Sequence, residues 1–203
     1  MYIDSRSLKK GLYYCAALIL SLCASSKVFA HYDLVASDSS VNFLSTKNVN
    51  ITESHSFDRL SGNLSSTGEL SIEIDLTSVN TIIPIRNERM QKMLFNVSDY
   101  ATATFVASID ETLMTLPTGH SKTAEVIGTL SIGGVSNPST FHIRVTGLQD
   151  GRLLATTIKP TIINANDFEL GTGLEALREI ALLQNITTAV PLTFSVVFSK
   201  NGH

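Results

Sequence analysis

The stretch TIIPIRNERMQKMLFNVSDYATATF, from Thr81 to Phe105, decides the fold. It predicts the end of a strand, a charged helix that opens on Arg86, a turn and a second strand. Apolar residues recur at helical spacing in residues 87–95, whereas from Ala103 onward apolar and polar residues alternate with period two. The order strand, short helix, turn and strand therefore predicts a sheet protein that carries a helix between two of its strands.

The alternation with period two recurs along the chain, and it places one face of each strand on a core and the other in water. Segments with this pattern cover residues 70–76, 103–109, 126–132, 141–145 and 190–198. Short turns separate them at residues 116–119, 133–134 and 149–151. This rhythm predicts an all-β fold, an antiparallel barrel of about eight strands. One or two short helices, in residues 87–95 and 174–183, are expected to cover an opening or an edge.

The first 30 residues are typical of a secretory signal peptide. Basic side chains precede the apolar run 11–22, and Val28-Phe29-Ala30 ends in a small residue suited to cleavage. The run falls short of the roughly 20 apolar residues that a spanning helix needs, so we expect no stable transmembrane anchor. A periplasmic or secreted domain of residues 31–203 is predicted. Lipidation at Cys23 remains an alternative.

Composition narrows the class of partner. The chain has 15 basic and 18 acidic residues; residues 1–30 contain four of the basic and one of the acidic groups, which leaves 11 and 17, a formal charge of −6. An acidic domain of this kind does not predict nucleic-acid binding. Both cysteines, Cys15 and Cys23, precede the predicted domain, so its stability must come from a core rather than from disulfides.

Motifs for catalysis and for metal binding are missing from the sequence. The histidines are scattered without the spacing of a zinc site, and no nucleophile elbow or phosphate loop is found. We therefore predict no enzyme activity, no catalytic residue, no metal site and no cofactor other than a bound lipid. A terminal His31 could still bind copper or zinc after cleavage. His55 and His142 are expected to face solvent.

Four blocks of sequence, in the right order, carry a resemblance to a known family. They are Tyr32-Asp33-Leu34 with Ser40-Val41-Asn42-Phe43, the segment 81–105, GTLSIGGVSNP in residues 128–138, and INANDFELG in residues 163–171. The chain resembles the YceI-like family, whose members are lipocalin-like barrels that bind long-chain isoprenoids or other lipids. The resemblance covers essentially all of residues 31–203. It implies a binder of an apolar small molecule, which could pair into a homodimer.

The chain departs from the family's recurrent polar positions. Ser39, Arg89 and Gly133 stand where histidines are usual, and Asn87 replaces an aspartate. The family's histidines and aspartate at these positions could hydrogen-bond a phosphate or bind a metal. The resemblance therefore implies binding of a hydrocarbon tail and leaves the head group open.

Predicted ligand-binding residues fall into two groups. Arg86 is expected to meet an anionic head group, helped by the N–H groups of the following helix, and Arg89 to add a second cation. Alternatively, Arg86 pairs with Glu88 or Asp99 as a structural clamp and Arg89 faces solvent. The apolar members would gate or line the barrel: Met90, Met93, Leu94, Phe95, Phe105, Phe141 and Phe194. Ordinary core packing is their alternative role.

The sequence thus predicts a protein that sequesters or carries a long-chain isoprenoid or other amphiphilic lipid inside a barrel. The alternative is a non-catalytic, stress-related interaction module whose barrel is filled by its own side chains. Small residues on the predicted inward faces, such as Ala103, Ala107 and Gly128, fit either one. The internal volume distinguishes them.

Overall fold

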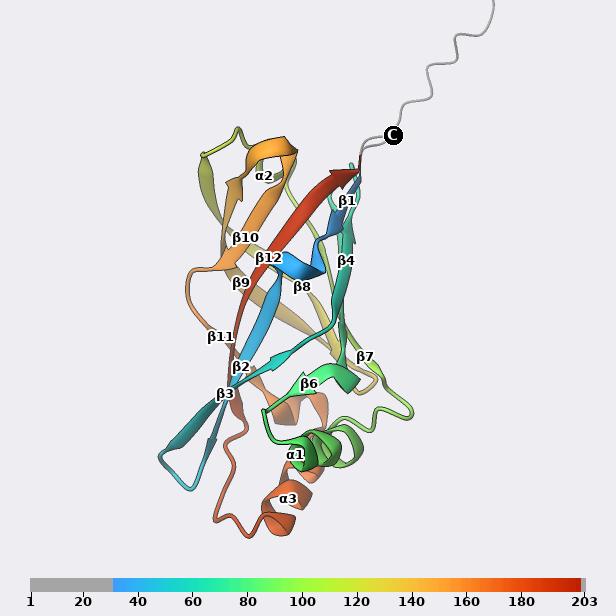
Figure 1. The fold of residues 1–203 in the computed structure, drawn as a ribbon, viewed down its shortest axis with the longest axis vertical. Coiled ribbons are helices and arrows are strands. Elements are labelled where there is room, and N and C mark those ends of the chain that lie inside the picture. The colour runs from blue at the N-terminus through green and yellow to red at the C-terminus, as the bar shows by residue number, and fades with distance from the viewer. Residues whose placement is uncertain (1–30, 202–203) are drawn as a thin grey trace, which may run out of the picture.

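Eight antiparallel strands close into a barrel in the computed structural model, which describes residues 31–201 (Figure 1). Their order around the ring is β1, β4, β5, β7, β8, β9, β10 and β12, and pairing of β1 with β12 closes it. Their bounds are His31–Leu34, Leu60–Leu64, Glu69–Asp75, Thr102–Ser108, Ser121–Ile132, Val135–Gly147, Leu153–Thr157 and Ala189–Asn201. The predicted antiparallel barrel of about eight strands is confirmed.

Strand β12 runs the length of the barrel and pairs with different strands in its two halves. Its second half lies between β10 and β1, and its first half lies between β11 (Thr161–Asn164) and β2 (Ser40–Lys47). Strand β2 continues into a hairpin with β3 (Ile51–Phe57), which pairs in turn with the short β6 (Val79–Asn80). The hairpin extends the barrel wall at the end shown at the bottom of Figure 1.

Helical segments cover that same end, which we call the helical end. They are α1 (Pro84–Arg89), the π-helical turn η3 (Met90–Leu94) and α3 (Gly171–Ile180). Both predicted helices are present, although each begins three residues earlier than expected. Pro84 explains the first start, because its fixed φ suits the first turn of a helix. The remaining short elements are η1 (Ala36–Asp38), η2 (Leu76–Ser78), α2 (Glu111–Met114), η4 (Gln149–Gly151) and η5 (Ala165–Phe168).

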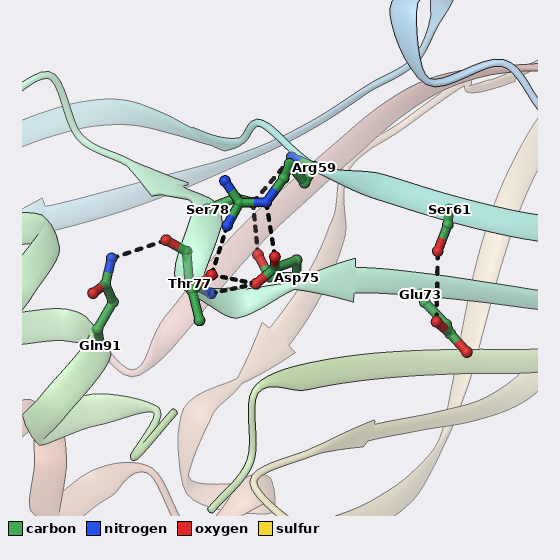
Figure 2. Close-up of polar contacts among 7 residues, drawn as sticks. All are labelled: Arg59, Ser61, Glu73, Asp75, Thr77, Ser78 and Gln91. Atoms are coloured by element: carbon green, nitrogen blue, oxygen red, sulfur yellow. Dashed lines mark hydrogen bonds and ion pairs between the residues drawn. The ribbon is translucent and has the colours of Figure 1, made fainter. Parts of the chain in front are cut away.

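A cluster of polar contacts ties α1, η3 and α3, together called the helical cap, to the barrel (Figure 2). Arg59, next to β4, donates from Nε to Asp75 Oδ2 at 2.8 Å and from Nη2 to Thr77 Oγ1 at 2.6 Å. Gln91 of η3 donates from Nε2 to the Thr77 carbonyl at 2.9 Å. The cap is therefore held to the strand ends by directional bonds as well as by apolar packing.

Apolar side chains fill most of the far half of the barrel. The alternating residues predicted to face inward on β9, Phe141 among them, are buried, as are Val196 and Phe198 of β12. Val190, Leu192 and Phe194, which lie nearer the helical end of β12, are half-buried. Phe141 lies edge-on to Phe105 and Phe194, with ring centroids 4.9 and 5.6 Å apart. This aromatic cluster takes up much of the interior away from the helices, because aromatic side chains bury large areas in a few close contacts.

Candidate functional site

An apolar cavity of about 400 Å³ lies inside the helical end of the barrel. Residues from β2, β3, β5, β7, β8, β11 and β12 form its walls, and α1, η3 and α3 cover it. Its deep part is lined by side chains such as Leu76, Phe95 and Leu177, all of them buried. A cavity of this size and lining suits one apolar ligand, since empty apolar cavities stay dry and accept hydrocarbon.

A second, smaller cavity of about 120 Å³ occupies the far half of the barrel. Ile74, Leu130 and Leu192 line both cavities and so form the partition between them. The three phenylalanines of the aromatic cluster line only the smaller one. The barrel is therefore largely filled by its own side chains at one end, apart from the smaller cavity, and hollow at the other.

The inner face of the β2–β3 hairpin changes from apolar to charged toward its tip. The inward residues run Phe43, Ser45, Lys47 along β2 and Phe57, His55, Glu53 along the paired β3. The apolar members lie deep in the cavity, whereas the charged ones keep between a quarter and a third of their side-chain surface in contact with solvent. The hollow thus has an apolar interior and a polar edge.

Two cations share a single carboxylate oxygen at this polar edge. Glu53 Oε2 accepts from Lys47 Nζ at 2.7 Å and from Arg86 Nη1 at 2.7 Å. Arg86 Nη2 also donates to the Thr81 carbonyl at 2.7 Å. The hydrogen bond from Lys47 lowers the pKa of the Glu53 carboxyl most strongly, partial burial opposes it, and Arg86 lowers it further. The ionised cluster keeps one net positive charge.

Two buried polar atoms of the site have no partner within the described residues. They are Nδ1 of His55, whose side chain is 95% buried, and Nε of Arg86. Burial lowers the pKa of the His55 imidazole, and the charge of Arg86 lowers it further, so the ring is neutral at pH 7. Because an unpaired buried polar group is costly, these atoms indicate a place for a polar group of a ligand.

The structure separates the sequence-predicted ligand residues into three sets. Arg86, Arg89, Met90, Leu94 and Phe95 line the large cavity; Phe105, Phe141 and Phe194 line the small one. Met93 lines neither of these two cavities and packs among the apolar residues beneath η3. Whether these residues bind a ligand stays a prediction. The two cavities provide the space that a bound ligand would require.

Three local expectations need correction. The ion-pair partner of Arg86 is Glu53, rather than Glu88 or Asp99, since the β2–β3 hairpin folds over α1. The helix does not begin after Arg86 but at Pro84, so its first N–H groups do not frame that side chain. His55 is buried beside the Phe43 ring, at a centroid distance of 5.3 Å, instead of facing solvent.

Lys47, Glu53 and His55 are site residues that the sequence reading missed. All three occupy alternate positions of two strands, so period two was present around them. Their polar side chains hide it, because period two is recognised from apolar residues at every second position. His142, by contrast, lies on the outer face of β9, 3.5 Å from Glu125.

Other sequence expectations concern metals and membranes. Residues 31–201 contain no cluster of three or more histidine, cysteine, aspartate or glutamate side chains that could hold a metal ion. Within the same range, no helix has the length and apolar character to cross a bilayer. The predicted signal peptide and Cys23 lie outside the described residues.

Comparison with solved structures identifies several relatives of the fold. A polyisoprenoid-binding domain from Saccharophagus degradans, implicated in plant cell wall breakdown, shares 36% identity and a TM-score of 0.82; the match covers 85% of this chain and 99% of that one. BcnA of Burkholderia cenocepacia matches at 22% identity over 81% and 98% of the two chains, with a TM-score of 0.57. A Campylobacter jejuni YceI protein matches at 20% identity over 73% and 85%, with a TM-score of 0.53.

No curated protein sequence matches the chain. The sequence model of the YceI-like domain matches residues 32–198, from the first barrel strand to the last. The match covers both strands of the charged hairpin, the helical cap and the walls of both cavities. The chain is a member of the YceI-like family.

Proposed function

We propose that this protein binds and carries one long-chain isoprenoid or other amphiphilic lipid, with the tail in the large cavity and the head group at the hairpin edge. The observation that carries the proposal is the apolar cavity of about 400 Å³ with charged residues at one edge only. The polyisoprenoid-binding domain that is 36% identical to this chain supports it. The open volume disfavours an interaction module with a fully filled barrel.

The cavity volume sets the length of tail that fits. If a chain carbon takes about the volume of a water molecule, roughly 30 Å³, the cavity of about 400 Å³ holds about 13 carbons. That length corresponds to two or three isoprene units. A longer tail would have to pass Ile74, Leu130 and Leu192 to reach the smaller cavity, or leave through the mouth.

The hairpin cluster indicates the chemistry of the head group. Lys47 and Arg86 are neutralised only in part by Glu53, and Arg86 keeps an unpaired N–H group. A phosphate, a carboxylate or a hydroxyl could accept that bond, and an anion would also be attracted by the remaining positive charge. His55 Nδ1 offers a further hydrogen bond beneath the cluster.

Tail burial supplies most of the expected affinity. At about 0.8 kcal/mol per buried methylene, 13 carbons contribute roughly 10 kcal/mol before the costs of association and ordering. We propose that the carrier acts in the periplasm or outside the cell, as the signal-like residues 1–30 suggest, and that it performs no catalysis. Lipid-free protein would then be the form that receives cargo.

The test is a titration of delipidated protein with farnesol and with farnesyl diphosphate. Both should bind one to one, and the diphosphate should bind more tightly. In Arg86→Met the advantage of the diphosphate should shrink while the affinity for farnesol stays, because only the head-group contact is lost. Binding of neither compound, or of any short peptide in preference to both, would contradict the carrier.

A further inference from the structure

Three loops at the helical end present large apolar side chains to solvent from backbone conformations that such residues avoid. Val49, Ile82 and Leu182 have φ of 71°, 65° and 54°, and they are 65%, 87% and 93% exposed. The other non-glycine residues with positive φ in the described chain are all polar: Asn48, Asn96, Asp150 and Glu169. β-Branched residues with positive φ are genuine outliers, so this placement is not a general habit of the loops.

Two of the three stand where glycine would be the ordinary residue. Leu182 follows α3 as the left-handed residue of a Schellman motif, closed by bonds from Leu182 N to Glu179 O and from Leu183 N to Arg178 O, both 3.0 Å. Val49 is the centre of a tight turn in which Asn50 N donates to Asn48 O at 2.9 Å. A positive φ at that position makes it the rare, strained form of γ-turn.

Ile82 is held in the same manner, by a polar neighbour. Its N–H donates to Asn80 Oδ1 at 2.9 Å, and its side chain projects into solvent, where 87% of the residue is exposed. At none of the three positions does the side chain line either cavity. Neither core packing nor the ligand site therefore accounts for the apolar residue.

The three side chains surround the mouth of the large cavity. Ile83 and Ile85 beside Ile82, and Ile180 and Leu183 beside Leu182, all line that cavity. The hairpin tip is bonded to the loop after α3, from Val49 N to Asn185 Oδ1 at 3.2 Å and from Gln184 N to Asn48 Oδ1 at 2.8 Å. The β2–β3 tip, α1 and α3 all lie at one end of the molecule in Figure 1.

From this arrangement we infer that the helical end docks on a lipid bilayer, with Val49, Ile82 and Leu182 inserted among the acyl chains around the cavity mouth. The inference goes beyond ligand binding, and docking can be measured without cargo. Apolar side chains reach into the boundary between head groups and acyl chains when a protein lies at a membrane surface. A tail could then pass between bilayer and cavity without entering water.

Charge near the mouth agrees with an anionic bilayer. The three elements around the mouth, the β2–β3 hairpin, the segment 81–95 and α3, carry five basic side chains against four acidic ones, a small positive excess in a chain where acidic residues outnumber basic ones. The basic ones are Lys47, Arg86, Arg89, Lys92 and Arg178, and the acidic ones are Glu53, Glu88, Glu175 and Glu179. Juxtamembrane basic residues gain energy from the negative surface potential of anionic lipids. Ile83, Ile85 and Ile180, each roughly half exposed, extend the apolar rim around the opening, which adds to the surface that can enter a bilayer.

The test uses the absence of tryptophan from the sequence. Ile82→Trp and Leu182→Trp place one fluorophore each at the rim, and Ile127→Trp places one on the outer face of β8, at an isoleucine that is also well exposed. Each full chain is mixed with vesicles of phosphatidylglycerol and brominated phosphatidylcholine. We expect a blue shift and quenching at positions 82 and 182, and neither at 127.

A second variant separates docking from folding. The triple variant combines Val49→Asn, Ile82→Asn and Leu182→Asn. Asparagine tolerates positive φ, so the protein should fold, but vesicle binding should weaken about tenfold for each apolar side chain removed. Equal quenching at all three tryptophans would overturn the inference. So would a blue shift that depends on protein concentration and not on vesicles, because it would assign the rim to a second copy of the chain.

Discussion

Replacing Ala103 by leucine should weaken lipid binding by a predictable amount. Ala103 is fully buried on β7 and lines the large cavity. The change adds three carbons, which take up roughly 90 Å³ at about 30 Å³ per carbon. The tail must then give up about three carbons of contact.

The loss of affinity follows from the burial of those carbons. At about 0.8 kcal/mol for each, the variant loses roughly 2.4 kcal/mol. Since about 1.4 kcal/mol is a factor of ten, farnesol should bind roughly 50-fold more weakly. The free energy of unfolding should change by no more than about 1–3 kcal/mol, the range for added core volume.

Ala155→Leu is the matched control, because Ala155 lines only the smaller cavity. Delipidated protein is titrated with farnesol in a calorimeter. The affinity should fall roughly 50-fold in Ala103→Leu and change little in Ala155→Leu. Circular dichroism and thermal unfolding establish that both variants fold. Unchanged affinity in a folded Ala103→Leu, or the same loss in both variants, would refute the placement of the tail.

Three further predictions concern stability. Leu182→Asn should stabilise the fold by about 1 kcal/mol, a rise in Tm of roughly 2–4 °C, because asparagine relieves part of the strain at φ of 54°; an unchanged or lower Tm would count against that strain. Gly128→Ala should cost about 1–3 kcal/mol in denaturant unfolding, since its Cβ would clash with the Val106 carbonyl oxygen and lie 2.5 Å from the Phe105 ring; a neutral change would show that both the β7 backbone and the ring have room to move. Burial, aided by the charge of Arg86, lowers the pKa of His55, so above its ordinary value of 6.5 the residue is neutral folded and unfolded and contributes no pH dependence. As pH falls below 6.5 the unfolded chain binds a proton that the folded chain resists, so the wild type should lose more stability than His55→Phe between about pH 6.5 and 5; parallel profiles would contradict this.

Much of the barrel could be predicted because its strands obey simple alternation. In residues 141–145 of β9 and 192–196 of β12 the inward residues are apolar and the outward ones polar, so period two reveals strand and face together. The helices also followed from their apolar spacing. Their first turns were missed because proline and isoleucine at the start of α1 do not by themselves reveal that a helix has begun.

The site was harder to predict because it depends on contacts between distant segments. Glu53 meets Arg86 across 33 positions of sequence, and only the fold of the hairpin over α1 brings them together. The free volume likewise depends on how neighbours pack. At Gly128 the space of the missing side chain is taken by Phe105, so a small inward residue does not by itself predict a cavity.

The exposed apolar rim of Val49, Ile82 and Leu182 could not be predicted from the pattern of apolar residues either. A leucine just after a helix and an isoleucine two residues before a proline look ordinary in sequence. Their backbone angles and exposure make them unusual, and both depend on the Schellman motif after α3 and on the hydrogen bond from Ile82 N–H to Asn80 Oδ1. A left-handed residue is predictable only when glycine or asparagine occupies it.

The central claim is that the large cavity holds one apolar chain in the working protein. The most direct measurement is mass spectrometry of the intact protein, purified from the cells that make it, under native and then denaturing conditions with organic extraction. The account predicts one stoichiometric long-chain lipid in the wild type and its depletion in Ala103→Leu but not in Ala155→Leu. A folded wild type that carries no lipid, and takes none up when mixed with lipid extracts of those cells, would contradict it.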